Sequence, residues 1–154
     1  MTIAVAADHA GFPLKAQVIE AVRKTGADPI DLGTNSTEAV DYPDYAGAAG
    51  RAVVEGRADR AIVVCGSGAG ACIAANKVRG IRAATCHDTF SAHQSVEDDD
   101  VNVLCLGSRI IGPALAIEVV RAFLNARFSG AERHVRRIGK IAQLEADFCA
   151  PALP

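Results

Sequence analysis

The chain is poor in large aromatic side chains and has no excess of charge of one sign. It contains no tryptophan, and aromatic residues make up only 5% of its 154 positions. No apolar run reaches the roughly 18 residues that a membrane-spanning helix requires. Lysine and arginine number 16 against 18 aspartates and glutamates, which gives a net charge of -2 and no basic footprint for nucleic acid. We therefore expect neither a membrane protein nor a nucleic-acid-binding protein.

The sequence also lacks the cysteine patterns of disulfide frameworks and zinc sites. Its five cysteines are odd in number and form no C-x-x-C pair. This usage indicates reduced thiols, and with no basic, signal-like segment at the N-terminus it predicts a cytoplasmic protein without a metal. The length predicts one domain over residues 1–148, able to bury roughly 70% of its unfolded surface. Residues 149–154 are expected to form a disordered tail.

The strongest local signal lies in residues 61–77. Residues 61–64 form a continuous, mostly β-branched apolar run, which is typical of a parallel strand covered on both faces. Gly66, Gly68 and Gly70 then alternate with small residues, so the backbone can turn sharply and bring its N–H groups close to a ligand. A helix is expected to follow. The stretch predicts an anion-binding loop with Cys65 at its edge.

Three interpretations of this loop are compatible with its spacing. Residues 66–71 fit the G-x-G-x-x-(G/A) dinucleotide fingerprint, and Asp88 lies about where its ribose-binding acid is expected. That fingerprint normally follows the first strand of a domain, however, whereas two strand–helix units precede the loop here. The loop can also be a connection that binds nothing. We favour chemistry at Cys65, because backbone N–H groups and a helix N-terminus stabilise a thiolate.

Strand-like and helix-like segments alternate along the chain. Short strands are expected at residues 2–7, 29–32, 60–64, 81–86 and 102–106. Besides the helix after the glycine loop, helices are expected at residues 12–25, 43–55, 89–96, 112–128 and 131–147. This order predicts an α/β protein with a five-stranded, parallel, Rossmann-like sheet.

Ligands of such sheets bind at the carboxyl ends of the strands, and polar residues follow several of the predicted strands. We expect one edge of the sheet to gather Asp8, His9, Asp41, Tyr42, residues 65–70, His87, Asp88, Ser108 and Arg109. His9 can bind an anion or relay a proton there, or it can be an ordinary hydrogen-bonded residue. His87 and His93 have no companion at metal-ligand spacing, so we interpret them as residues of the surface or of the surroundings of the site.

Arg133 and Arg137 lie four residues apart on the last predicted helix, so they point the same way, as two cations on a phosphate would. A solvated basic helix face is the alternative. Arg109, at a strand end, is the stronger candidate for a phosphate ligand. The cysteines other than Cys65 are interpreted as packing residues.

A thiolate at Cys65 can be a nucleophile or a general base. No Cys-His-Asn arrangement of nucleophilic catalysis is legible in the sequence. A base would remove a proton next to a carbonyl, and the N–H groups of the loop would hold the enediolate oxygens as charge develops. Base, oxyanion cradle and phosphate clamp together indicate an aldose–ketose isomerase of a phosphorylated sugar.

Residues 2–145 resemble the ribose-5-phosphate isomerase B family, which includes the galactose-6-phosphate isomerase subunits. The resemblance rests on these motifs: Ala7-Asp8-His9-Ala10-Gly11, Asp41-Tyr42-Pro43-Asp44-Tyr45-Ala46, Cys65-Gly66-Ser67-Gly68-Ala69-Gly70, Ala74-Ala75-Asn76-Lys77, Gly80-Ile81-Arg82-Ala83, Asn102-Val103-Leu104, Gly107-Ser108-Arg109 and Arg133-His134.

The resemblance implies a three-layer fold and a sugar-phosphate isomerase of the pentose phosphate pathway that needs neither metal nor cofactor. It implies a homodimer or a dimer of dimers with sites shared between subunits, and a C-terminal helix used in dimerisation. Cys65 resembles the base and Ser67 the hydroxyl beside it. The oxyanion-binding amides implied are those of Gly66, Gly68, Ala69 and Gly70; the implied phosphate ligands are His9, Arg109, Arg133 and Arg137; and Asp8, Tyr42 and Asn102 are expected around the sugar.

Two positions separate this chain from other members of that family. Members without the cysteine use a glutamate just past the loop, where this chain has Ala71, so Cys65 must serve as the base. The family usually has a ring-opening histidine four residues before the Asn-Val-Leu strand, where this chain has Asp98. We therefore expect Asp98 to take part in catalysis, and we keep three alternatives to a ribose 5-phosphate isomerase: an isomerase of a tetrose 4-phosphate, one of a hexose 6-phosphate, and a sugar-phosphate sensor without catalysis.

Overall fold

The computed structural model describes residues 1–148, so the expected tail at residues 149–154 lies outside the described residues. Five parallel strands form one sheet in the order β2-β1-β3-β5-β4. Their bounds are β1 Thr2–Ala7, β2 Asp28–Asp31, β3 Arg60–Cys65, β4 Ala83–Thr85 and β5 Val103–Gly107. The predicted α/β fold with a five-stranded parallel sheet is confirmed.

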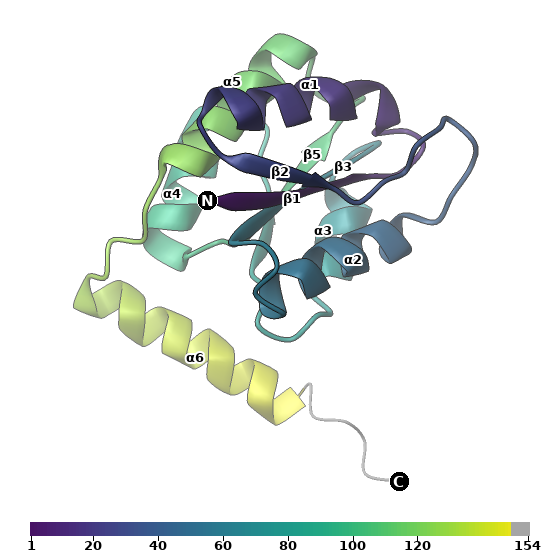
Figure 1. Ribbon diagram of the computed structural model, residues 1–154. Coiled ribbons are helices and arrows are strands. Elements are labelled where there is room, and N and C mark those ends of the chain that lie inside the picture. Colours follow the sequence, from purple (N-terminus) through teal and green to yellow (C-terminus); the bar gives the residue numbers. More distant parts are fainter. Residues whose placement is uncertain (149–154) are drawn as a thin grey trace, which may run out of the picture.

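Helices cover both faces of the sheet, as Figure 1 shows. Helices α1, α4 and α5 pack on one face, and α2 and α3 pack on the other. The helices are α1 Phe12–Lys24, α2 Tyr42–Val54, α3 Ala69–Ala75, α4 Thr89–Asp99, α5 Pro113–Asn125 and α6 Glu132–Phe148. None of these described helices is both long and apolar enough to cross a membrane.

The central strands send alternate side chains to the two faces. Ile62 and Val64 of β3 face α1 and α5, whereas Val63 and Cys65 face α2 and α3. Both sets are buried, which explains why the strand reads as an unbroken apolar run. The Cys65 sulfur thus belongs to the face covered by α2 and α3.

The layer formed by α2 and α3 is built from small residues. Ala46, Ala49 and Ala52 are the fully buried side chains of α2, and Ala71 and Ala75 are those of α3. Short side chains let a helix backbone approach the sheet closely. This layer therefore holds the loop before α3 near the ends of β3 and β5.

Three elements differ by three or more residues in length from the sequence-based prediction, and one of them, α5, was expected to continue to residue 128 but ends at Asn125. Strand β4 was expected from residue 81 but begins at Ala83, because the backbone N–H of Arg82 donates to the Asn102 side chain instead of extending the ladder. Helix α4 continues to Asp99 and ends where Asp100 adopts a left-handed conformation with φ 49°.

The strand order reverses between β1 and β3. From β1 the chain goes through α1 to the edge strand β2, and from β3 it goes through α3 toward β4 and β5. The loops after β1 and β3 therefore diverge, and the crevice between them is the usual ligand site of an open α/β sheet.

Helix α6 projects from the body of the protein, as Figure 1 shows. Its described contacts are mainly with α4 and with the turn at Gly80, whose N–H donates to the Glu145 carboxylate. Val135, Ile141 and Leu144 are 53%, 45% and 58% exposed. Helix α6 thus presents apolar side chains that its own chain leaves uncovered.

The close approach of α1 to β3 gives a stability prediction. A Cβ at Gly11 would lie 2.0 Å from the carbonyl oxygen of Val64, a backbone atom that cannot move away cheaply. We expect Gly11→Ala to lower the free energy of unfolding by about 3 kcal/mol or more, because overpacking against a rigid backbone forces the helix outward.

Equilibrium denaturation measures the effect, and Gly112→Ala is the matched control. Gly112 also precedes a helix, has a negative φ, and has open space where a Cβ would be. Gly112→Ala should lower the free energy of unfolding by at most about 1 kcal/mol, as helix-cap changes do. Equal effects of the two substitutions would contradict the proposed contact.

Candidate active site

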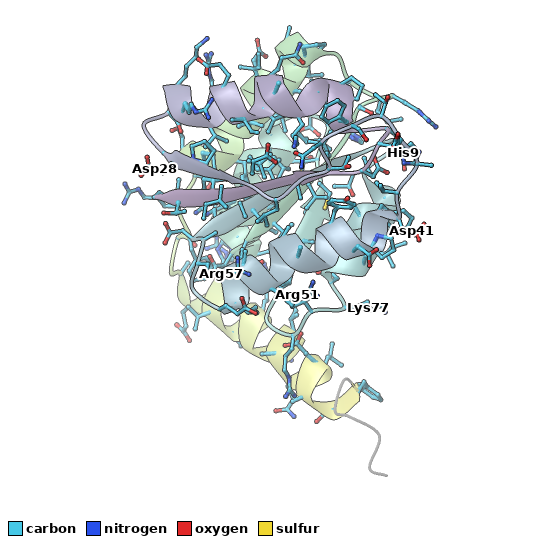
Figure 2. The ribbon with its side chains drawn as sticks, turned by 45° about the vertical axis from the view of Figure 1, so that its right-hand side comes forward. His9, Asp28, Asp41, Arg51, Arg57 and Lys77 are labelled. Carbon is cyan, nitrogen blue, oxygen red and sulfur yellow. The ribbon has the colours of Figure 1, made fainter. Side chains whose placement is uncertain are left out.

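A cavity of about 350 Å³ opens at the carboxyl ends of β1, β3 and β5. Figure 2 places His9 and Asp41 at this edge of the sheet, opposite Asp28 at the start of β2. The lining comprises Asp8, His9, Ala10, Tyr42, Cys65, Gly66, Ser67, Gly70, Arg109 and Ile110. Eight of these residues are among the site residues expected from the sequence; Gly68 and Ala69 belong to the same loop without lining the cavity.

The glycine loop needs its glycines for space. Gly68 has a φ of 84°, and a Cβ there would lie 2.8 Å from the Thr85 methyl group. A Cβ at Gly70 would lie 2.8 Å from the Tyr42 ring. The loop is therefore wedged between β4 and the start of α2, which fixes where its backbone amides point.

Cys65 ends β3 at the wall of the cavity and is only 4% exposed. Its sulfur accepts a hydrogen bond from the Gly68 N–H at 3.1 Å. This hydrogen bond ties the sulfur to the glycine loop. Ser67, which is exposed beside it, accepts a longer hydrogen bond from the Ala69 N–H at 3.4 Å.

Arg109 is held over the loop by backbone hydrogen bonds. The N–H of Ser108 donates to the Cys65 carbonyl at 2.8 Å, and the N–H of Arg109 donates to the Gly66 carbonyl at 3.0 Å. The Ser108 hydroxyl also donates to the Ala10 carbonyl at 2.7 Å. The turn after β5 is thus attached to the loops after both β3 and β1, and its guanidinium reaches the cavity.

His9 is oriented by the loop between β2 and α2. Its Nδ1 lies 3.2 Å from both the N–H and the carbonyl of Val40. When Nδ1 accepts from this N–H, Nε2 carries the proton of the neutral ring and can donate to an anion in the cavity. His9 is therefore suited to binding an anion without a charge of its own.

A buried lysine anchors the same loop. Lys15 is 4% exposed, and its Nζ donates to the Asp31 carboxylate at 2.7 Å and to the Thr34 carbonyl at 2.6 Å. A buried ammonium without such partners would be costly, so these bonds fix the start of the loop. The sequence analysis did not identify this residue.

Asp8 has a structural bond in addition to its place in the cavity. It is 7% exposed, and its Oδ1 accepts from the Gly11 N–H at 2.8 Å. Its own N–H donates to the Val64 carbonyl at 3.2 Å. The carboxylate is therefore fixed at the cavity wall before any ligand arrives.

Three of the expected site residues lie together away from this cavity. Asp98 is on α4, and its Oδ1 lies 3.4 Å from Nε2 of His134 on α6. His134 is 2% exposed, and its Nδ1 is 2.7 Å from the Ser129 hydroxyl. Arg133 and Arg137 are exposed on the same helix. The cavity of the same chain contains none of these side chains.

Asn102 is not brought to the cavity either. It precedes β5 and so lies at the amino end of the sheet, where its Oδ1 accepts from the Arg82 N–H at 2.8 Å and its Nδ2 donates to the Gly80 carbonyl at 3.0 Å. Its amide thus holds the turn before β4 and has no contact with the cavity of its own chain.

Cys72 differs from the simple packing residue that the sequence suggested. A hydrogen bond from the Cys105 thiol, opposed by burial and assisted by Thr85, lowers the pKa of Cys72 to about 6. Its thiol lies against the Ala83 carbonyl, and it does not line the cavity. The hydrogen bond to Cys72, followed by burial, raises the pKa of Cys105 well above its usual range.

Ala10 and Ile110 are cavity residues that the sequence analysis did not identify. Each directly follows an identified residue, His9 or Arg109, at a strand end, and that position was the available signal. Within residues 1–148, no three His, Cys, Asp or Glu side chains are grouped so that they could hold a metal ion.

Comparison with known proteins gives consistent matches over nearly the whole chain. A family model described as Ribose/Galactose Isomerase matches residues 3–141. Ribose-5-phosphate isomerase B of Escherichia coli is 43% identical over 143 residues, which are 93% of this chain and 95% of that protein. D-erythrulose-4-phosphate isomerase of Pectobacterium atrosepticum is 42% identical over 131 residues, 84% of this chain and 86% of that protein.

The fold matches solved structures equally well. Ribose-5-phosphate isomerase B of Clostridium thermocellum superimposes with a TM-score of 0.93 at 44% identity, covering 96% of this chain and 99% of that one. The likeness covers nearly the whole of both chains.

Proposed function

The chain belongs to the ribose/galactose isomerase family of sugar-phosphate isomerases, and we propose that it interconverts an aldose phosphate and a ketose phosphate of the ribose 5-phosphate type with Cys65 as the base. The observation that carries this assignment is the position of the Cys65 sulfur, which lines the cavity and accepts the Gly68 N–H at 3.1 Å. No carboxylate competes for this role at position 71, because Ala71 is there and is fully buried.

The proposed reaction is a proton transfer between two carbons. The Cys65 thiolate removes the proton from C2 of the open-chain aldose, and the C2–H electron pair forms a C1=C2 double bond while the C1 carbonyl oxygen becomes an enediolate oxygen. Amides of residues 66–70 stabilise this oxygen. The C2 hydroxyl proton moves to the C1 oxygen, a transfer that the Ser67 hydroxyl assists, and the Cys65 thiol returns its proton to C1, which leaves a hydroxyl on C1 and a carbonyl at C2 of the ketose.

We propose further that two chains complete each site. Within one chain the cavity has a single guanidinium, that of Arg109, whereas Arg133 and Arg137 are exposed on the projecting helix α6. The uncovered Val135, Ile141 and Leu144 give this helix an apolar surface for a second copy of the chain. In a dimer with twofold symmetry, α6 of each chain would reach the cavity of the other.

Asp98 would reach the partner's site together with α6. The contact between Asp98 and the buried His134, 3.4 Å from Oδ1 to Nε2, joins the end of α4 to α6. The other ring nitrogen of His134, Nδ1, lies 2.7 Å from the Ser129 hydroxyl, so the imidazole is held between the two. A carboxylate in this place can accept a proton, whereas an imidazole can also give one near neutral pH.

This carboxylate favours a second candidate substrate. A pentofuranose phosphate needs a proton donor at its ring oxygen before it can open, whereas a tetrose 4-phosphate has its fourth oxygen esterified and cannot close a furanose. A chain with Asp98 therefore suits an acyclic tetrose phosphate. The similarity to the Pectobacterium protein named D-erythrulose-4-phosphate isomerase supports keeping this candidate.

The role of Cys65 is tested by isotope exchange. In heavy water, Cys65→Ala should slow exchange of the C2 proton of a bound aldose phosphate by at least about a hundredfold, the usual contribution of a positioned base. Cys72→Ser is the control, because the pKa of Cys72 is lowered to about 6 but its thiol faces away from the cavity. Exchange lost in Cys72→Ser and kept in Cys65→Ala would reverse the assignment. No exchange with any phosphorylated aldose would favour a sensor.

The phosphate clamp is tested on neighbouring arginines. Arg137→Ala should raise KM for the phosphate ester by about ten- to a hundredfold, since a hydrogen bond between charged groups contributes roughly 1.5 to 3 kcal/mol. Arg136→Ala, which removes an equally exposed cation from the next position, should change KM little.

Mixing two defective chains tests whether the site is shared. In random dimers of Cys65→Ala and Arg137→Ala chains, half the dimers are mixed and each has one intact site, so about a quarter of wild-type activity should return. Activity that stays at the level of the separate variants would place Arg137 outside the partner's site.

The substrate is tested at position 98. Asp98→His should raise kcat/KM for ribose 5-phosphate relative to erythrose 4-phosphate by at least about tenfold, because an imidazole can both give and accept a proton near neutral pH. Asp99→His, at the exposed neighbouring position, is the matched control. If neither substitution favours ribose 5-phosphate, position 98 does not determine the substrate.

A further inference from the structure

His87 takes the place of a strand carbonyl at the edge of the site. Strand β4 ends at Thr85, so the ladder between β4 and β5 has no further strand residue to pair with Gly107 at the end of β5. The Gly107 N–H instead donates to Nε2 of His87 at 2.9 Å. The imidazole thus accepts the hydrogen bond that a longer β4 would accept through its backbone.

Gly107 lies between the turn that carries Arg109 and the glycine loop beside Cys65. A Cβ at Gly107 would lie 2.7 Å from both the carbonyl carbon and the carbonyl oxygen of Ser67, so its backbone touches the glycine loop. The next two residues, Ser108 and Arg109, donate to the Cys65 and Gly66 carbonyls. A shift of the Gly107 peptide would therefore move the Arg109 guanidinium and the loop beside Cys65 together.

We propose that His87 is a positioning residue, which must be neutral to hold Gly107 and thereby keep Arg109 and the glycine loop in their anion-binding arrangement. A neutral imidazole has one nitrogen that accepts, whereas a protonated imidazole has two donors. Protonation of His87 would set an N–H against the Gly107 N–H and release the turn. Anion binding should therefore weaken as the pH falls through the range in which histidines titrate.

The charged and titratable groups around His87 come from four elements. Asp88 follows it in the chain and is exposed, and the hydrogen bond from the Ser91 N–H lowers the pKa of that carboxyl. Cys86 precedes it, Arg109 is on the turn after the neighbouring strand β5, and Cys65 and His9 lie farther along the same edge of the sheet, at the ends of β3 and β1. None of these groups replaces Nε2 as the acceptor of the Gly107 N–H.

A side chain that accepts a hydrogen bond at every pH distinguishes this pH-dependent role of His87 from a purely structural role. In His87→Gln the side-chain carbonyl can reach the position of Nε2 and accept from Gly107 at every pH. Between pH 8 and pH 5.5, KM for the sugar phosphate should rise about five- to tenfold more in the wild type than in His87→Gln, the effect of one lost hydrogen bond. His87→Leu, which cannot accept, should show the raised KM already at pH 8.

The comparison between variants removes other titrations from the result. The phosphate ester changes charge near pH 6, but this change contributes equally to the wild type and to His87→Gln. Because the KM measurement rests on the proposed isomerase function, binding of sulfate, which stays dianionic over this range, is measured in parallel by calorimetry. Its affinity should show the same difference between the two proteins even without any turnover.

Two results would overturn the proposal. One is a His87→Gln protein whose sulfate affinity falls, and whose KM rises, as steeply with acid as those of the wild type. The other is a His87→Leu protein with wild-type sulfate affinity at pH 8. Loss of turnover in every protein, with the sulfate difference intact, would reject the isomerase assignment and leave the role of His87 standing.

Discussion

The site depends on backbone hydrogen bonds that join the loops after β1, β3 and β5 to one another. Ser108 and Arg109 donate to the carbonyls of Cys65 and Gly66, and Asp8 donates to the Val64 carbonyl. These bonds continue the parallel ladder past the ends of the strands. Because the acceptors are main-chain atoms, the relative positions of the thiol, the glycine loop and Arg109 follow from the register of the sheet.

The unequal faces of the sheet support this arrangement. On the face of α1 and α5 the core contains large side chains such as Leu104, Leu106 and Phe123. On the face of α2 and α3 it is mainly alanine, so these helices can lie close to the strands. The Tyr42 ring at the start of α2 then meets the backbone of Gly70 at the start of α3. Close packing on one face thus holds the glycine loop at the wall of the cavity.

The sequence was sufficient to predict an element or a site residue where the local pattern and the rules of the fold agree. The apolar run before Cys65 predicts a buried parallel strand. Because ligands bind at the carboxyl ends of parallel strands, Asp8, His9 and Arg109 are predicted to line one site. The same rule placed Ser67 and Tyr42 at this edge, where both line the cavity, and the family resemblance implied their roles. The bounds of most elements follow from proline, glycine and hydrophobic periodicity.

The direction of α6 and the contacts of Asn102 and His87 could not be predicted, because they depend on contacts between distant segments that no local pattern contains. Periodicity predicts that α6 is a helix but not that it leaves the body of the protein, because direction depends on what covers its apolar side chains. Asn102 belongs to the family motif, yet its amide pairs with the turn at Gly80 and Arg82, which lie 22 and 20 residues earlier in the chain. The bond from Gly107 to His87 is likewise a product of strand lengths rather than of sequence spacing.

Charge balance explains why a site built on one chain would be incomplete. The cavity wall contains one fixed carboxylate, Asp8, and one guanidinium, Arg109, whose charges cancel, and His9 can donate while neutral. A phosphate dianion brought into this cavity would therefore have no net compensating charge, and a thiolate at Cys65 adds repulsion. A partly buried anion needs paired cations to offset the loss of hydration. Arg133 and Arg137 carry the two positive charges that a dianion requires, and their place on a helix with uncovered apolar side chains supports the proposal that a second copy of the chain delivers them.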